Sequence, residues 1–170
     1  MQAVPSVESK QLPWQTIVLF ALGFWLSSSL ILDLVIMPGL YGAGMMTSAG
    51  FAAAGYSIFW IFNRVELLCA AVALTGSLVL WSTTHLSSRH RNGSIILSTL
   101  LLTIALIYTY ILTPQMSALG LQLNLFEPGV GMPEGMLPMQ AGYWGLETLK
   151  LAAGGILLSW CYQSQTRSLN

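Results

Sequence analysis

The sequence predicts an all-α integral membrane protein, with four helices in an antiparallel bundle and a single transmembrane domain over residues 1–170. Hydrophobic residues make up 55% of the chain and charged residues only 7%. A soluble domain usually carries about 25% charged residues, so this chain has too few charges for a water-facing surface. Its 6 Lys and Arg equal its 6 Asp and Glu, so it has no basic surface for nucleic acid.

Four segments hold about 20 mostly apolar residues each, the length that crosses a bilayer. The helices are expected at about 14–37, 59–81, 94–113 and 143–162. The first and third are expected to end before Pro38 and Pro114, because proline lacks the N–H that continues a helix. The outer loops are then 38–57 and 114–142, although the second helix has an alternative start near Gly50.

Basic residues predict the orientation of the chain. Lys10 precedes the first helix, Arg89 and Arg91 lie between the second and third, and Arg167 is in the tail. Cytoplasmic segments carry an excess of Lys and Arg. We therefore expect both termini on the cytoplasmic side of a plasma, inner or thylakoid membrane.

The two halves of the chain show a weak internal similarity. Asp33–Pro38 ends the first helix and Thr109–Pro114 ends the third, while Glu66 and Glu147 lie in the helices that follow. A duplicated two-helix unit would explain this pattern. Chance similarity between short apolar helices is the alternative, and the sequence leaves both open.

Small residues predict which helices pack together. Ala and Gly recur over 70–76 in the second helix and over 152–155 in the fourth. In lipid, small residues allow helix backbones to approach closely. We therefore expect the second and fourth helices to touch along these stripes.

Polar and charged residues fall in the outer third of the predicted membrane domain. They form a candidate polar cluster of Asp33, Asn63, Arg64, Glu66, Glu147 and Lys150. On insertion scales a charge at the bilayer centre costs about 2.5–3.5 kcal/mol, so several ionisable groups from three helices require partners or a function.

Residue spacing limits the pairs that these groups can form. Glu147 and Lys150 are three residues apart and share a helix face. Arg64 and Glu66 are two apart and point to nearly opposite sides. Arg64 is therefore expected to pair with Asp33 or with lipid headgroups, and Glu66 to pair with Lys150 or to be protonated. The cluster is either a proton, ion or ligand site or a structural tie between helices.

Methionines provide a candidate metal site on the outer side. Met132, Met136 and Met139 have a spacing that a short helix could direct at one Cu(I) ion, which prefers thioether ligands. Methionine is also a flexible apolar filler, so packing is the alternative. His85 and His90 lie between the second and third expected helices. No histidine lies within a predicted span, where it could bind haem.

The segments Gly23–Leu26, Asp33–Pro38 and Phe62–Glu66 carry a family resemblance. The chain resembles uncharacterised four-helix membrane proteins with a domain of unknown function, loosely grouped with copper-resistance D-like membrane proteins. The match covers the first two helices best and extends more faintly to Pro114 and Glu147. The resemblance implies a four-helix integral membrane fold, and it brings no established activity or catalytic residues.

The sequence contains none of the nucleotide-binding, zinc-protease or hydrolase motifs that indicate an enzyme. The favoured hypothesis is a non-enzymatic accessory or scaffold protein that packs in the lipid bilayer against other membrane proteins, a second copy of itself, lipids or pigments. The alternative is a small transporter, or a protein that handles protons or metal ions with the polar cluster. A membrane enzyme is a third hypothesis.

Overall fold

The computed structural model describes residues 14–45, 50–83, 88–126 and 136–169. Nearly all of these residues are helical, and no strand occurs in the described ranges, so the predicted all-α class is confirmed. Three stretches are long and apolar enough to cross a membrane: Trp14–Leu40, Ala53–Leu80 and Asn92–Leu119. These stretches support the prediction of a membrane protein.

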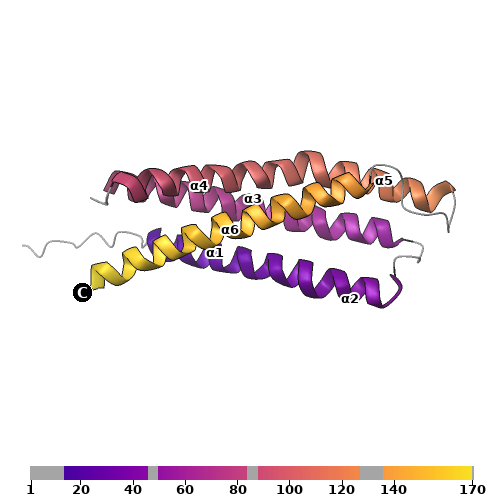
Figure 1. Ribbon diagram of the computed structural model, residues 1–170, viewed down its shortest axis with the longest axis horizontal. Helices are drawn as coiled ribbons and strands as arrows, with labels where there is room; N and C mark the ends of the chain where they lie inside the picture. Colours follow the sequence, from indigo (N-terminus) through magenta and orange to yellow (C-terminus); the bar gives the residue numbers. More distant parts are fainter. Residues whose placement is uncertain (1–13, 46–49, 84–87, 127–135, 170) are drawn as a thin grey trace, which may run out of the picture.

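The described helices form four long rods (Figure 1). The first rod comprises α1 (Trp14–Ile31), the π-helical segment η1 (Leu32–Ile36) and α2 (Met37–Gly42), and the second is α3 (Phe51–Thr83). The third comprises α4 (Ser88–Ile107), the π-helical segment η3 (Tyr108–Leu112) and α5 (Thr113–Phe126), and the fourth is α6 (Met136–Leu169). Consecutive rods run in opposite directions, so α1 begins at the same end at which α6 finishes (Figure 1).

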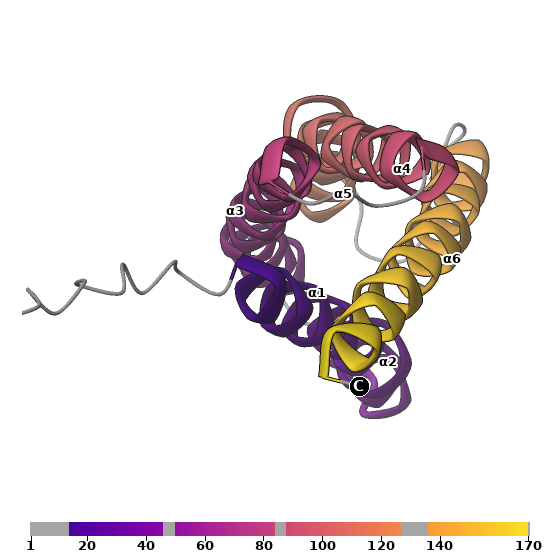
Figure 2. The ribbon, with the colours of Figure 1, turned by 90° about the vertical axis from the view of Figure 1, so that its left-hand side faces the viewer.

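The rods surround a common core. Contacts join α1 to α3, α3 to α4, α4 to α6 and α6 to α1, and α3 and α6 occupy opposite corners of the arrangement (Figure 2). The core is apolar over the half of the rods that holds the start of α1 and the end of α6, and it includes Val18, Leu22, Trp25, Ala70, Ala73, Leu101, Ala105, Ala153 and Leu157. The buried residues Asp33, Glu66, Glu147 and Lys150 lie next to this apolar layer, on the side of the end that carries α2 and α5.

The expected contact between the small-residue stripes is wrong, because α3 and α6 face each other diagonally (Figure 2). The small residues instead admit side chains of α1. A Cβ on Gly76 of α3 would lie 2.1 Å from Cγ2 of Val18, and one on Gly154 of α6 would lie 2.7 Å from Cδ2 of Leu26. The first rod therefore packs closely against both α3 and α6.

Neither Pro38 nor Pro114 ends its helix, contrary to the sequence-based expectation. Each proline follows a π-helical segment that begins six residues before it. In these segments the N–H of Met37 donates to the carbonyl of Leu32, and that of Thr113 donates to the carbonyl of Tyr108, five residues back in each case. A π turn pairs a carbonyl with the N–H five residues later instead of four. The hydrogen bonding before each proline is therefore changed, and the rod continues past it.

The regions expected as outer loops are largely helical. The range 38–57 holds most of α2 and the first turns of α3, and α3 starts at Phe51, as the alternative near Gly50 predicts. Gly50 has a φ of 94°, a conformation that glycine adopts easily. The range 114–142 holds most of α5 and the start of α6. Their Gly- and Pro-rich composition suggested loops, but Pro138 lies in the first turn of α6, where a proline leaves no hydrogen bond unmade.

The fourth expected span, 143–162, lies within α6. This helix is not among the three that meet the hydropathy criterion for crossing a membrane. Glu147 and Lys150 lower its hydropathy, although both side chains are buried against the other rods. These two charged side chains of α6 are thus directed to the core.

Candidate functional site

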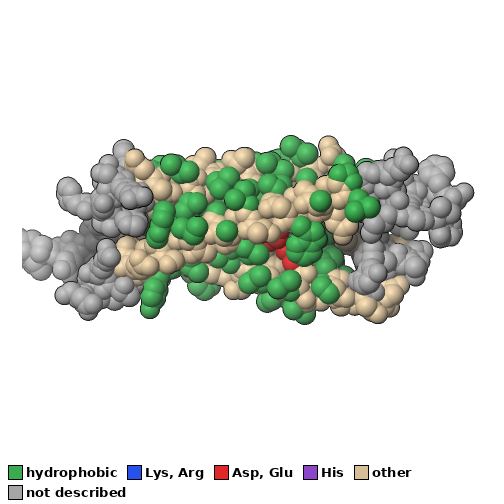
Figure 3. All heavy atoms as spheres, in the orientation of Figure 1, with side chains coloured by type: hydrophobic (Ala, Val, Ile, Leu, Met, Phe, Trp, Pro, Cys, Tyr) green, Lys and Arg blue, Asp and Glu red, His purple; other side chains and the backbone are tan. Residues whose placement is uncertain are grey.

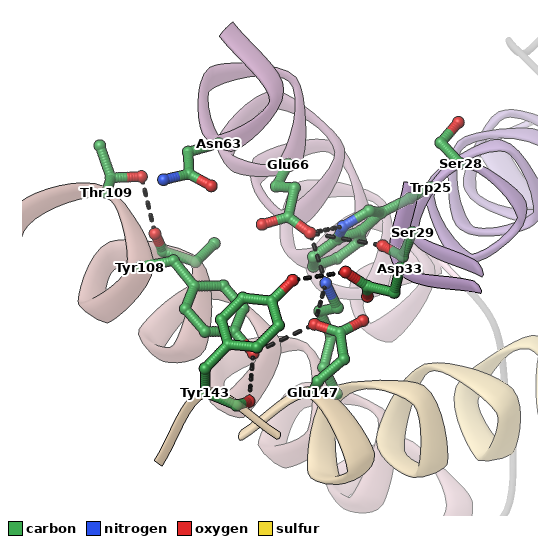
Figure 4. A network of polar contacts seen from close by, with 12 residues as sticks. Trp25, Ser28, Ser29, Asp33, Asn63, Glu66, Tyr108, Thr109, Tyr143 and Glu147 are labelled. Atoms are coloured by element: carbon green, nitrogen blue, oxygen red, sulfur yellow. Dashed lines mark hydrogen bonds and ion pairs between the residues drawn. The ribbon is translucent and has the colours of Figure 1, made fainter. Parts of the chain in front are cut away.

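Polar side chains from all four rods meet in one buried group (Figure 4). This central cluster consists of Trp25, Ser29, Asp33, Glu66, Tyr108, Tyr143, Glu147 and Lys150. Glu66, Glu147 and Lys150 are each only 1% exposed, and Asp33 is 6% exposed. Acidic atoms are visible at one small opening between α6 and α1, among apolar side chains (Figure 3).

Lys150 lies between two glutamates at the centre of the cluster. Its Nζ is 2.5 Å from Oε1 of Glu66 and 2.7 Å from Oε2 of Glu147. The pair with Glu147 is the one that the residue spacing predicts, and the pair with Glu66 is one of the two alternatives expected for that glutamate. The ammonium group therefore joins α6 to the rod diagonally opposite, α3.

Each glutamate also accepts a hydrogen bond from an aromatic side chain. Nε1 of Trp25 donates to Oε1 of Glu66 over 2.9 Å, and the hydroxyl of Tyr108 donates to Oε2 of Glu147 over 3.1 Å. The hydroxyl of Ser29 adds a longer contact of 3.4 Å to Glu66. In both halves of the chain the aromatic donor comes from the rod that precedes the glutamate.

Asp33 enters the cluster from the π-helical segment η1. Its Oδ1 accepts a hydrogen bond of 2.6 Å from the hydroxyl of Tyr143 on α6. The Tyr143 ring packs against that of Tyr108, with ring centroids 5.3 Å apart. Because Tyr108 lies on η3, the two π-helical segments deliver their polar side chains to the same region of α6.

Two of the predicted residues do not join the central cluster. Arg64 lies on the exposed face of α3, and its guanidinium carbon is 4.2 Å from the ring centroid of Trp60. Its expected pairing with Asp33 is not formed, and its contact with lipid headgroups stays a prediction. Asn63 is buried beside the cluster (Figure 4), and its Nδ2 donates to Oγ1 of Thr113 over 2.7 Å.

The central cluster carries an excess of acidic groups. Among the described residues, three carboxyl side chains are buried there with a single buried ammonium group. Oε1 of Glu147 is buried and has no hydrogen-bond partner. An unpaired charge in a low-dielectric interior costs several kcal/mol, so the buried group neutralises by taking up a proton or a counter-ion. The arrangement can therefore bind at least one further positive charge.

Sequence reasoning missed four members of the central cluster, namely Trp25, Ser29, Tyr108 and Tyr143. A spacing of four residues relates Trp25, Ser29 and Asp33, and it also relates Tyr143 and Glu147. This spacing places residues on one helix face. The position of Trp25 in the middle of an apolar span, away from the interfaces that tryptophan prefers, was a second available signal.

The methionine site lies partly outside the described residues. Met132 is not described, Met136 is the first residue of α6, and Met139 follows it on the same helix. Within the described ranges, no group of three or more His, Cys, Asp and Glu side chains is arranged to hold a metal ion. Binding of Cu(I) by these methionines stays a prediction.

Comparisons of the chain with protein-family models, curated proteins and solved structures find no match. The resemblance to four-helix membrane proteins therefore stays an expectation.

Proposed function

We propose that this chain is a small proton-handling membrane protein in which the central cluster binds and releases a proton. The observation that carries the proposal is the burial of three carboxyl groups, Asp33, Glu66 and Glu147, around the single ammonium of Lys150. Ionisable residues inside a membrane are expensive and commonly belong to proton or ion pathways. A purely structural tie needs only one carboxylate for one ammonium group.

The position of the cluster suggests where the proton is exchanged. We infer that all four rods cross the bilayer, with both termini on the cytoplasmic side and the cluster nearer the opposite surface. The basic residues Lys10, Arg89, Arg91 and Arg167 all belong to the proposed cytoplasmic side. Asp33 is the most exposed carboxyl group of the cluster, and it is therefore the proposed point of exchange with the outer surface.

Proton movement is tested with the full chain reconstituted in liposomes that enclose a pH-sensitive dye. After a pH jump, the wild-type protein is expected to accelerate the internal pH change, and Glu66→Gln is expected to return the rate to that of protein-free liposomes. Arg64→Gln is the matched control, because Arg64 lies two residues before Glu66 on the exposed face of the same helix. Wild-type rates equal to those of empty liposomes under gradients of either direction would remove this function.

A non-enzymatic accessory or scaffold role is the second candidate, and the near-complete enclosure of Glu66, Glu147 and Lys150 favours it. Enclosed polar groups can hold helices together in lipid. Under this proposal the protein co-purifies in stoichiometric amounts with a larger membrane complex in mild detergent. Glu147→Gln then weakens that association, while proton movement in liposomes is absent from the wild type as well.

We also propose that the two halves arose from one two-helix unit. The equal spacing between each π-helical segment and its proline supports this proposal, as does the aromatic donor that each glutamate receives. A parallel repeat would bring Glu66 and Glu147 into related positions around a shared partner. Lys150 fills that position in the present chain.

A further inference from the structure

We propose that Asp33 and Glu147 share one proton and form a carboxyl–carboxylate pair, which is the proton-binding site of the protein. The proposal deepens the proposed function and rests on it, because it names the two groups between which the proton is held. The pair is built from the π-helical segment η1 and from α6.

The hydrogen bonds of Glu147 leave one position unfilled. Its Oε2 accepts from the hydroxyl of Tyr108 and from Nζ of Lys150, whereas its Oε1 is buried without a partner. The carboxyl groups of Asp33 and Glu147 lie next to each other in Figure 4. An ionised carboxylate is only an acceptor. A hydrogen bond between these two groups therefore requires that one of them carries a proton.

The positive charge that faces the pair is too small to neutralise both of its carboxylates. Lys150 approaches Glu66 and Glu147 at similar distances, 2.5 Å and 2.7 Å, so its single charge is shared with a carboxylate outside the pair. The remaining polar groups that face the pair are Tyr108 and Tyr143, which donate neutral hydrogen bonds. One proton between Asp33 and Glu147 reduces the charge of the cluster by one unit.

A proton suits this site better than a hard metal cation. Calcium takes six to eight oxygen ligands and magnesium requires near-octahedral coordination. The described residues contain no group of carboxylate, imidazole or thiol side chains arranged for a metal ion. A proton needs only the two facing oxygens, and its release leaves two ionised carboxylates and one hydrated proton, so atoms and charge balance.

The pair has an exit for that proton. Asp33 is more exposed than the other carboxyl groups and the ammonium group of the cluster, and acidic atoms reach the small opening between α6 and α1 (Figure 3). Glu147 is enclosed behind it at 1% exposure. The proton therefore passes between the pair and the outer surface through Asp33.

Infrared spectroscopy of the full chain in detergent tests the shared proton directly. The chain has only six Asp and Glu residues, and exposed carboxyl groups are ionised at neutral pH. The wild type is expected to show the carbonyl band of a protonated carboxyl group at neutral pH, with a shift in heavy water. Asp33→Asn and Glu147→Gln should each remove the band, because the new amide donates to the remaining carboxylate. Arg64→Gln should retain it.

Two results would overturn the shared proton. One is the absence of a protonated-carboxyl band from the wild type at neutral pH. The other is a band that survives Asp33→Asn and disappears in Glu66→Gln, which would place the proton on Glu66. If Glu147→Gln does not fold, Asp33→Asn alone decides, because it keeps an oxygen for Tyr143 and its helical content can be checked by circular dichroism.

The pH dependence of unfolding provides a second readout. The wild type is expected to lose thermal stability relative to Asp33→Asn as the pH is raised, because alkali removes the shared proton and leaves two facing carboxylates. Parallel curves for the two proteins would contradict the pair. A band without proton flux in liposomes would retain the pair and remove only the transport function, whereas flux without the band would place the transferred proton elsewhere.

Discussion

Lys150 on α6 reaches Glu66 on α3 across the diagonal of the four rods, with Nζ 2.5 Å from Oε1. These two helices occupy opposite corners and pack mainly against α1 and α4. The ion pair is therefore a direct link between rods whose backbones are not neighbours. Loss of this ion pair is therefore expected to weaken the packing of both α3 and α6 at the core.

Replacement of Lys150 by Met is expected to destabilise the fold by about 3–5 kcal/mol, the range for removal of one partner of a buried ion pair. Glu66 and Glu147 would both lose their buried counter-charge. Unfolding in detergent measures the change. Lys150→Met combined with Glu66→Gln should recover part of the loss, and additive effects of the two substitutions would argue against the diagonal pair.

Tyr108→Phe is expected to cost about 1.5–3 kcal/mol, the usual range for a hydrogen bond to a charged group. The substitution removes the hydroxyl that donates to Glu147 and leaves the ring in place. Tyr110→Phe is the matched control, since Tyr110 lies on the same π-helical segment and is 68% exposed. Equal effects of the two substitutions, measured by unfolding in detergent, would contradict the role of Tyr108.

Gly76→Ala is expected to destabilise the protein by about 1–3 kcal/mol through overpacking. The new methyl group would overlap Cγ2 of Val18, a β-branched side chain with little freedom to move. Val18→Ala in the same chain should relieve the overlap. Gly155→Ala is the control, because no atom outside its own stretch of helix lies within 4 Å of its Cβ position, and alanine is favoured over glycine in a helix by about 1 kcal/mol.

The orientation of the chain is tested by single cysteines introduced at either end and labelled with a membrane-impermeant reagent. The native Cys69 and Cys161 are buried, so replacing both with Ala gives a clean background if the variant remains folded. Residues 3 and 168 are expected to react only after the cytoplasmic side is opened. Labelling of both from the outside would reverse the proposed topology.

Three of the four expected spans coincide with helices long and apolar enough to cross a membrane, and they were predictable because they depend on one quantity, the length of an uninterrupted apolar run. The continuation of the first and third rods beyond Pro38 and Pro114 was not predictable by the same means. Proline usually ends a helix, and the sequence carries no clear signal for the π turn that accommodates each one here.

The ionic part of the site was more accessible to sequence reasoning than its aromatic part. Glu147 and Lys150 share a helix face by spacing alone, and Glu66 has few other possible partners. The contribution of Trp25 depends on which rods are neighbours, and composition does not determine that order. The same limitation explains why small residues in α3 and α6 were expected to meet each other and instead receive Val18 and Leu26 of α1.

The π-helical segments η1 and η3 have a geometric consequence for the two rods that contain them. The hydrogen bond that closes each segment spans five residues, one more than in an α-helix. One residue corresponds to a rotation of about 100° around an α-helix axis. The segments α2 and α5 are thus rotated out of phase with α1 and α4. A helical wheel drawn from α1 or α4 assigns the residues of α2 or α5 to the wrong side, so substitutions in α2 and α5 need helical wheels of their own.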